Sequence, residues 1–237
     1  MRIVVHPDPD TLARAAAEMV ATELAAAEPG RRRSLALSGG STPAATFRYL
    51  RERPIDWGSV LLWLSDERWV PPDDPHSNGK VAAETLADHV PAMFLRPRWS
   101  GYVRPAEAAA FYEASLRRHL GGAPPDVVLL GMGVDGHTAS LFPGTAALDE
   151  RKRWVVANHV PQLDAWRLTA TRRLLAEART VIVLVAGLSK APVLARVLED
   201  PTAGLPAQIL ADLPGEVVWM VDRQAAAELT SSVVERP

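Results

Sequence analysis

Short apolar runs alternate along the chain with segments in which apolar residues recur every three or four positions. The runs predict buried β-strands at residues 3–5, 34–38, 60–64, 127–130, 180–186 and 217–221. The periodic segments predict helices at residues 9–28, 43–54, 81–86, 106–120 and 189–198. Continuously apolar strands that alternate with helices are typical of a mostly parallel sheet covered on both faces. The pattern therefore predicts an α/β fold with three layers, α/β/α, of the Rossmann-like kind.

Local signals place the ends of several elements. Asp8 is an expected N-cap and Pro9 an expected first residue of the first helix, which Pro29-Gly30 should end. Residues 154–157 and 167–171 indicate two strands of a less regular region. Neither a long linker nor an internal repeat interrupts the chain, so residues 1–237 are expected to form a single domain.

Composition narrows the class of protein. Of the 237 residues, 48% are hydrophobic and 23% charged, which is typical of a soluble globular chain. The chain has no cysteine, so a disulfide scaffold, a thiol nucleophile and Cys-ligated zinc are excluded, in agreement with a cytoplasmic location. The first apolar run is too short for a signal peptide, and no uncharged stretch approaches the ~18 residues of a membrane span.

Net charge bears on possible partners. There are 26 basic and 28 acidic side chains, which give a net charge of −2. A balance of this kind provides no general positive field for nucleic acid or for an anionic membrane. We therefore expect neither partner, and any anion site must be local.

The first candidate site follows the strand at residues 34–38 and reads Ser38-Gly39-Gly40-Ser41-Thr42-Pro43. Two glycines let a backbone approach an anion closely, and Ser41 and Thr42 add hydroxyl groups. Thr42 is the expected N-cap and Pro43 the first helical residue, so free N–H groups would face the same point. The segment predicts a phosphate cradle, with an ordinary glycine turn as the alternative. The lysine of a Walker loop is missing, so ATP is not implied.

The second candidate, residues 131–138, matches the pattern G-x-G-x-x-G. A dinucleotide site would need a long helix directly afterwards and an acidic residue at the end of the next strand. Pro143 and Gly144 limit any helix to about one turn, and the next strand runs into Asn158. We therefore favour a different role, in which His137 is a general base and Asp135 its neighbour. The remaining histidines are interpreted as structural: His6, His76, His89, His119 and His159.

Two further strand ends carry charge. Asp66-Glu67-Arg68 follows one strand, and Lys190 follows another at the start of a helix. Both could simply be solvated, but a cation at a helix N-terminus is unfavourable unless an anion is also present. The histidines and acids show no metal-ligand spacing. These features indicate chemistry on a small phosphorylated molecule that needs no metal and no cofactor.

Four segments in this order resemble the 6-phosphogluconolactonase family over roughly residues 35–195. They read SGGSTP from Ser38, DERWVP from Asp66 with Ser77-Asn78 behind it, GMGVDGHTASLFP from Gly131, and GLSKA from Gly187. The resemblance implies a NagB-like fold and hydrolysis of 6-phospho-D-glucono-1,5-lactone to 6-phosphogluconate in the oxidative pentose phosphate pathway. We expect the protein to be a monomer or a weak homo-oligomer.

The resemblance also assigns residues to roles. His137, Asp135 and Arg68 are the expected catalytic residues, with Arg68 serving either the phosphate or the developing oxyanion. The expected substrate-binding residues are Gly39, Gly40, Ser41, Thr42, Asp66, Arg167 and Lys190. Arg167 is matched to the family's arginine although the stretch before it departs from the proline-rich pattern of the family.

Two alternatives differ from this interpretation. Glucosamine-6-phosphate deaminase is similar in its SGGSTP and GDGH themes, but its pattern places a glutamate five residues after the histidine, where this chain has Phe142. Losing one relay carboxylate disfavours a reaction that needs several proton transfers. A non-catalytic sugar-phosphate sensor would keep the cradle but would need neither His137 nor Asp135.

Overall fold

The computed structural model describes residues 1–26, 30–230 and 234–235. The strands of its main sheet are β1 Arg2–His6, β2 Arg33–Leu37, β3 Val60–Leu64, β5 Met93–Leu95, β6 Val127–Gly131, β9 Thr180–Val185, β10 Glu216–Asp222 and β11 Val234–Glu235. Their order across the sheet is β11-β1-β10-β9-β6-β2-β3-β5, and each neighbouring pair is parallel. The prediction of a mostly parallel sheet is confirmed.

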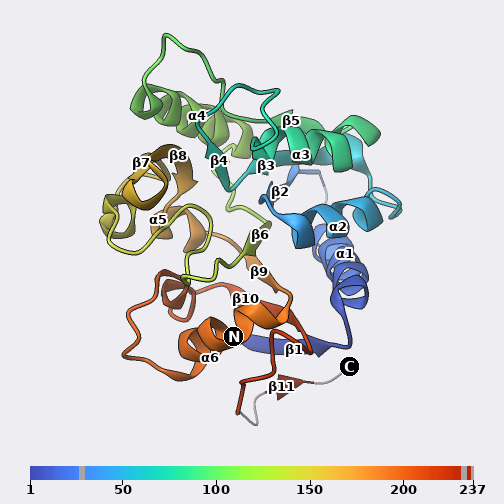
Figure 1. Cartoon of the computed structure of the whole chain (residues 1–237). Coiled ribbons are helices and arrows are strands. Elements are labelled where there is room, and N and C mark those ends of the chain that lie inside the picture. The colour runs from blue at the N-terminus through green and yellow to red at the C-terminus, as the bar shows by residue number, and fades with distance from the viewer. Residues whose placement is uncertain (27–29, 231–233, 236–237) are drawn as a thin grey trace.

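Helices cover both faces of this sheet, as the three-layer prediction requires. They are α1 Pro9–Ala26, α2 Ser41–Leu50, α3 Asn78–Thr85, α4 Pro105–Leu120, α5 Arg172–Leu175 and α6 Ala191–Glu199. Buried side chains of α1, α2 and α3 share one core cluster, and those of α4, α5 and α6 share the other. Figure 1 shows α1 and α2 on one side of the sheet and α5 on the other. Single turns of 3-10 helix lie at Trp57–Ser59, Ala87–His89, Ala146–Asp149, Pro161–Leu163, Leu188–Lys190 and Pro206–Leu210.

Alternation along each strand explains why the strands read as unbroken apolar runs. Along β9, Val181 and Val183 belong to the cluster under α4 and α6, whereas Ile182 and Leu184 belong to the cluster under α1 and α2. All four side chains are buried. Because helices cover both faces of the sheet, side chains that point to either face are buried, so successive strand residues are all apolar.

A second, antiparallel sheet packs on the side of α4. Its strands are β4 Asp66–Arg68, β7 Val155–Val160 and β8 Ala165–Ala170, with β8 in the centre. The two strands expected in a less regular region are therefore confirmed as β7 and β8. The sequence did not predict β4, since its three residues are all charged. Backbone pairing of Asp66 with Thr169 and of Arg68 with Arg167 makes it a strand.

Several boundaries differ from the prediction. The helix expected at 43–54 begins at Ser41 and ends at Leu50, and the one expected at 81–86 begins at Asn78. Strands β5 and β11 were not predicted, being only three and two residues long. The predicted end of the first helix at Pro29 lies outside the described residues.

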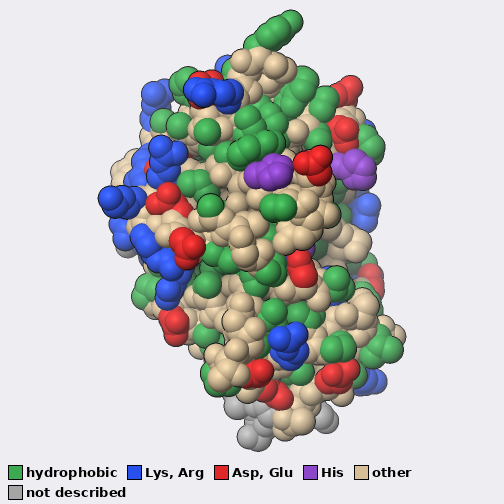
Figure 2. Space-filling model, turned by 60° about the vertical axis from the view of Figure 1, so that its left-hand side comes forward, with side chains coloured by type: hydrophobic (Ala, Val, Ile, Leu, Met, Phe, Trp, Pro, Cys, Tyr) green, Lys and Arg blue, Asp and Glu red, His purple; other side chains and the backbone are tan. Residues whose placement is uncertain are grey.

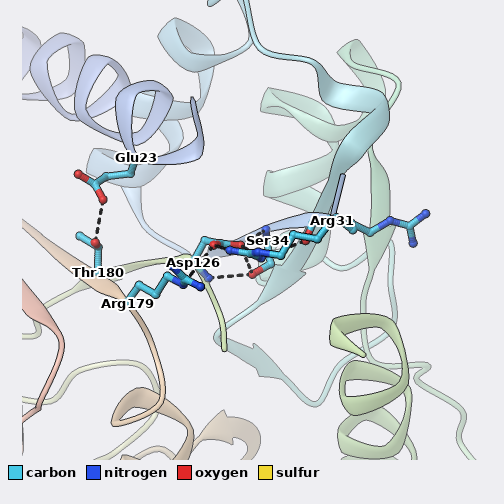
Figure 3. Close-up of polar contacts among 7 residues, drawn as sticks. Glu23, Arg31, Ser34, Asp126, Arg179 and Thr180 are labelled. Atoms are coloured by element: carbon cyan, nitrogen blue, oxygen red, sulfur yellow. Dashed lines mark hydrogen bonds and ion pairs between the residues drawn. The ribbon is translucent and has the colours of Figure 1, made fainter. Parts of the chain in front are cut away.

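The opposite end of the strands is closed by a buried carboxylate. Asp126, just before β6, accepts two hydrogen bonds from the guanidinium of Arg31 and one from the backbone N–H of Ser34 at 2.9 Å (Figure 3). Its backbone oxygen accepts the N–H of Thr180 at 3.0 Å. Asp126 thereby joins the starts of β2, β6 and β9. These contacts fix the three strands relative to one another at the end opposite their carboxyl ends.

The surface carries charges of both signs. On the face shown in Figure 2, Lys and Arg side chains gather along one edge, with acidic side chains among them. None of the helices within the described residues is both long enough and apolar enough to cross a membrane.

Candidate active site

A pocket of about 270 Å³ opens at the carboxyl ends of β2, β3, β6 and β9. This edge is where ligands bind in open α/β sheets. The structure brings to it these residues expected from the sequence: Gly39, Gly40, Ser41, Thr42, Asp66, Arg68, His137, Arg167 and Lys190. Asp135 does not line the pocket, but it contacts His137, which does.

The cradle at the end of β2 differs from the prediction in one respect. The N-cap of α2 is Gly40 and not Thr42, because Gly40 has a φ of 110° that suits glycine and its carbonyl accepts the N–H of Ala44 at 3.1 Å. Ser41 and Thr42 are thus the first two helical residues. The first N–H groups of a helix have no partner within the helix and attract anions. The arrangement suits a phosphate group.

Close packing surrounds the first glycine of the cradle. A Cβ atom at Gly39 would lie 1.8 Å from Oδ1 of Asn78 and 3.0 Å from Nη1 of Arg68. Asn78 is buried; its Oδ1 accepts a hydrogen bond from Arg68, and its Nδ2 donates to the backbone oxygen of Asp66 at 2.9 Å. Arg68 also donates to the backbone oxygen of His76 at 3.0 Å. Gly39 lets this arginine lie against the cradle.

The carboxylate of Glu67 binds the backbone around Arg68 and Asn78. This buried carboxylate accepts the backbone N–H groups of Arg68, Asn78 and Gly79, each at 2.7 Å, and the hydroxyl of Ser77 at 3.0 Å. Burial raises the pKa of Glu67 despite these hydrogen bonds. Glu67 was not predicted from the sequence to have a role of its own. The local signal for Glu67 is Ser77, the N-cap of α3, because a carboxylate is favourable beside the first N–H groups of a helix.

His137 and Asp135 form a close pair at the pocket rim. Nδ1 of His137 lies 2.6 Å from Oδ1 of Asp135, and the ring of Phe142 stacks on the imidazole with centroids 4.0 Å apart. The His137 side chain is 28% exposed and therefore reachable by solvent. Burial raises the pKa of Asp135, but attraction to His137 and hydrogen bonds from it outweigh burial and leave the pKa below its ordinary value. Asp135 thus favours the ionised form.

The loop that carries this pair is tighter than expected. The sequence left room for about one helical turn after the glycines, whereas the described residues between Gly136 and Thr145 contain no helix. Isolated β-bridges join Met132 to Thr138 and Thr138 to Leu141 instead. The long helix of a dinucleotide site is therefore not formed at this place.

Two more cations face the pocket. Burial lowers the pKa of Lys190, although Asp135 attracts its charge, and burial together with the charge of Arg68 lowers that of Arg167. Lys190 ends a 3-10 turn that begins after Gly187. The N–H of Gly187 donates to both carboxylate oxygens of Asp222, at 3.0 and 3.1 Å. Asp222 was not predicted as a functional residue, since nothing in the local sequence distinguishes the acid that ends β10.

No group of three or more His, Cys, Asp or Glu side chains that could hold a metal ion occurs among the described residues. The donors around the pocket are backbone N–H groups, hydroxyls, an amide and three cationic side chains. Such a set suits an anionic substrate better than a divalent cation.

Comparison with known proteins gives a consistent result. Residues 7–219 match the model of the family described as glucosamine-6-phosphate isomerases/6-phosphogluconolactonase. The chain is 36% identical to a 6-phosphogluconolactonase of Nostoc sp. over 96% of this chain and 98% of that protein. It is 42% identical to that of Rhizobium meliloti, over 81% and 85%. The 6-phosphogluconolactonase structure from Trypanosoma cruzi superposes with a TM-score of 0.88 at 30% identity, covering 97% of both chains.

Proposed function

The chain belongs to the family of glucosamine-6-phosphate isomerases and 6-phosphogluconolactonases, and from this premise we propose how its pocket acts. It hydrolyses 6-phospho-D-glucono-1,5-lactone to 6-phospho-D-gluconate, a step of the oxidative pentose phosphate pathway. The match covers 98% of the Nostoc 6-phosphogluconolactonase and 97% of the Trypanosoma cruzi structure. The observation that supports the mechanism best is the His137–Asp135 pair beside an anion cradle in one pocket.

The base in this mechanism is His137. Asp135 accepts a hydrogen bond from the N–H at Nδ1, which leaves the lone pair of Nε2 free to take a proton from water. The hydroxide equivalent attacks the lactone carbonyl, and the resulting oxyanion collapses as the ester C–O bond breaks. His137 then returns its proton to the departing ring oxygen, so no net proton is consumed within the site.

The phosphate occupies the cradle. The N–H groups at the start of α2, with the hydroxyls of Ser41 and Thr42, hold its oxygens, and Lys190 and Arg167 supply charge. Arg68 lies against Gly39, where its charge can serve the phosphate or the oxyanion. Asp66 completes the polar wall of the pocket.

Deamination of glucosamine 6-phosphate is the alternative within this family, but the pocket lacks a carboxylate that this reaction needs. A further carboxylate would have to take part in proton transfer at the histidine. Phe142 occupies that position, and its ring lies flat on His137. A ring that can neither give nor accept a proton favours hydrolysis.

We also propose that the protein works in the cytoplasm as a monomer or a weak homo-oligomer. A single copy of the chain brings the cradle, His137 and the three cationic side chains into one pocket. The cysteine-free composition agrees with a reducing compartment.

Replacing the base tests the mechanism. With freshly generated phosphogluconolactone and correction for spontaneous hydrolysis, His137→Ala should lower kcat at least about a hundredfold, because a positioned general base contributes ~10²–10⁴-fold. It should still bind 6-phosphogluconate. His159→Ala is the matched control, since His159 also contacts an aspartate, Asp164 at 3.5 Å, but lies outside the pocket. General-base catalysis at His137 is wrong if His137→Ala keeps more than about a tenth of wild-type kcat.

A further inference from the structure

The backbone beside His137 is strained. Ala139 has a φ of 48°, in the left-handed region, and lines the pocket two residues after His137. Among the described residues, Asp164 is the only other non-glycine with a positive φ. The Cβ atom of alanine makes this conformation unfavourable, so it persists only where the surroundings impose it. Strain of this kind concentrates at functional sites, which directs attention to whatever holds Ala139.

The next residue, Ser140, is held by three hydrogen bonds. Its hydroxyl donates to Oδ2 of Asp66 at 2.7 Å, its N–H donates to Oγ1 of Thr169 at 3.0 Å, and its carbonyl accepts Nδ2 of Asn158 at 2.9 Å. Ser140 is fully buried. All of its polar groups are therefore paired, and its three partners lie on β4, β7 and β8.

The residue before Ala139 is fixed differently. Thr138 donates through Oγ1 to the backbone oxygen of Gly131 at 2.9 Å, which ties the loop only to the strand from which it leaves. Ser140 instead ties the loop to a different sheet. Asp66, its partner, precedes Arg68 by two residues. The backbone oxygen of Asp66 accepts a hydrogen bond from Nδ2 of Asn78, and Oδ1 of Asn78 accepts one from the guanidinium of Arg68. A continuous set of hydrogen bonds thus runs from the His137 loop to Arg68.

We propose that Ser140 is a positioning residue: it holds Ala139 in the left-handed conformation and thereby fixes His137 relative to Arg68. The inference rests on the proposed lactonase mechanism, in which both side chains act on one lactone. Releasing the hydroxyl of Ser140 lets the strained residue relax toward an ordinary φ, and the imidazole then turns away from the attacking water. The N–H groups and hydroxyls of the cradle belong to another loop, residues 40–42, and the three hydrogen bonds of Ser140 go to other residues.

The test is a double-mutant cycle on kcat. Ser140→Ala removes only the hydroxyl and should lower kcat about 10- to 100-fold, the effect of misplacing a catalytic group by about an ångström. KM and the affinity for 6-phosphogluconate should stay within about twofold, because the cradle is untouched. In an Ala139→Gly background the left-handed conformation carries no strain, so the same serine change should lower kcat less than about threefold.

Thr180→Val is the matched control. Thr180 is buried at the start of β9, away from the pocket end of the strands, and its hydroxyl donates to Oε2 of Glu23 at 2.9 Å. Its loss also removes one buried hydroxyl hydrogen bond but should leave kcat near the wild-type value. If Ser140→Ala does not fold, Thr169→Val replaces it, because that change removes the acceptor of the Ser140 N–H.

Three results would overturn the proposal: kcat of Ser140→Ala above half of wild type, an equal loss of kcat in Thr180→Val, or a serine effect of equal size with and without the Ala139→Gly change. Wild-type enzyme is assayed in parallel on phosphogluconolactone. An inactive wild type would contradict the proposed function itself, whereas an active wild type with any of the three results would contradict only the role of Ser140.

Discussion

Adding one methyl group at Gly133 should separate His137 from Asp135. A Cβ atom there would lie 2.1 Å from Nδ1 of His137, 2.3 Å from its Cε1 and 2.5 Å from Oδ1 of Asp135. All three distances are far below van der Waals contact, and both partners sit where the new atom must go. The φ of Gly133 is not in the left-handed region, so alanine fits the backbone and the damage is confined to the pair.

The size of the effect follows from what the pair does. If the imidazole is turned away, the loss approaches the ~10²–10⁴-fold contribution of a general base, or about 3–5 kcal/mol of barrier. Overpacking should also cost about 1–3 kcal/mol of stability, which a domain of this size tolerates. Gly133→Ala should therefore remain folded and bind 6-phosphogluconate while its kcat falls at least about a hundredfold.

The assay is initial-rate hydrolysis of fresh phosphogluconolactone well below the melting temperature of the variant. Gly58→Ala is the control, because a Cβ there would meet its nearest atom at an ordinary 3.6 Å, in a turn far along the chain from the loop. Circular dichroism shows whether each variant is folded. A folded Gly133→Ala enzyme with kcat within about threefold of wild type would refute the need for the His137–Asp135 contact.

Three further predictions concern other parts of the molecule. Burial lowers the pKa of Lys190, so its positive charge should be lost at a lower pH than that of an exposed lysine. The Kd of 6-phosphogluconate, measured by calorimetry, should rise as the pH passes through that range, and Lys190→Ala should remove this rise. A rise that survives in Lys190→Ala would contradict the role of Lys190 in phosphate binding. Asp126→Ala removes the buried carboxylate that accepts hydrogen bonds from Arg31 and from the N–H of Ser34, so it should lower the free energy of unfolding in urea by about 3–5 kcal/mol. KM should stay unchanged, because Asp126 lies at the opposite end of the strands from the pocket. Exhaustive chelation should leave kcat unchanged, and restoration of lost activity by one added metal would show the metal-free mechanism to be wrong.

The sequence predicted the sheet and its helices because both depend on periodicity within short segments. The buried runs at β2, β6 and β9 each end at a glycine or a small residue, and parallel strands bring those ends to one edge. Lys190 was singled out on a local electrostatic argument, its place at a helix start. Such residues could be proposed as a site without knowledge of any long-range contact.

The supporting residues could not be predicted because their roles come from contacts between distant segments. Glu67 stands between Asp66 and Arg68, a pattern that usually means solvated charges, yet β8 and the start of α3 enclose it. Asp222 matters only because Gly187 lies beside it on the neighbouring strand end. The cap of α2 was misplaced since Thr42 is a better N-cap by propensity, whereas the positive φ of Gly40 decides where the helix begins.

Arg167 indicates that the pocket of the free protein stores unfavourable energy. Its Nε is buried with no hydrogen-bond partner among the described residues, and burial and the charge of Arg68 lower its pKa, more than Asp66 and Glu67 raise it. A bound phosphate would supply the missing partner and relieve the repulsion. Arg167→Met, which keeps an apolar stem near Phe142, should therefore raise the melting temperature of the free protein, by about 2–4 °C per kcal/mol relieved.

The same change should weaken binding of 6-phosphogluconate at least about tenfold, because a hydrogen bond to a charged group is lost. Thermal unfolding with and without 6-phosphogluconate measures both effects on one sample. The two shifts must have opposite signs if the arginine is retained for the ligand and not for the fold. A melting temperature below wild type in the free Arg167→Met protein would mean that Asp66 and Glu67 already compensate the buried charge, and the stored-energy argument would fail.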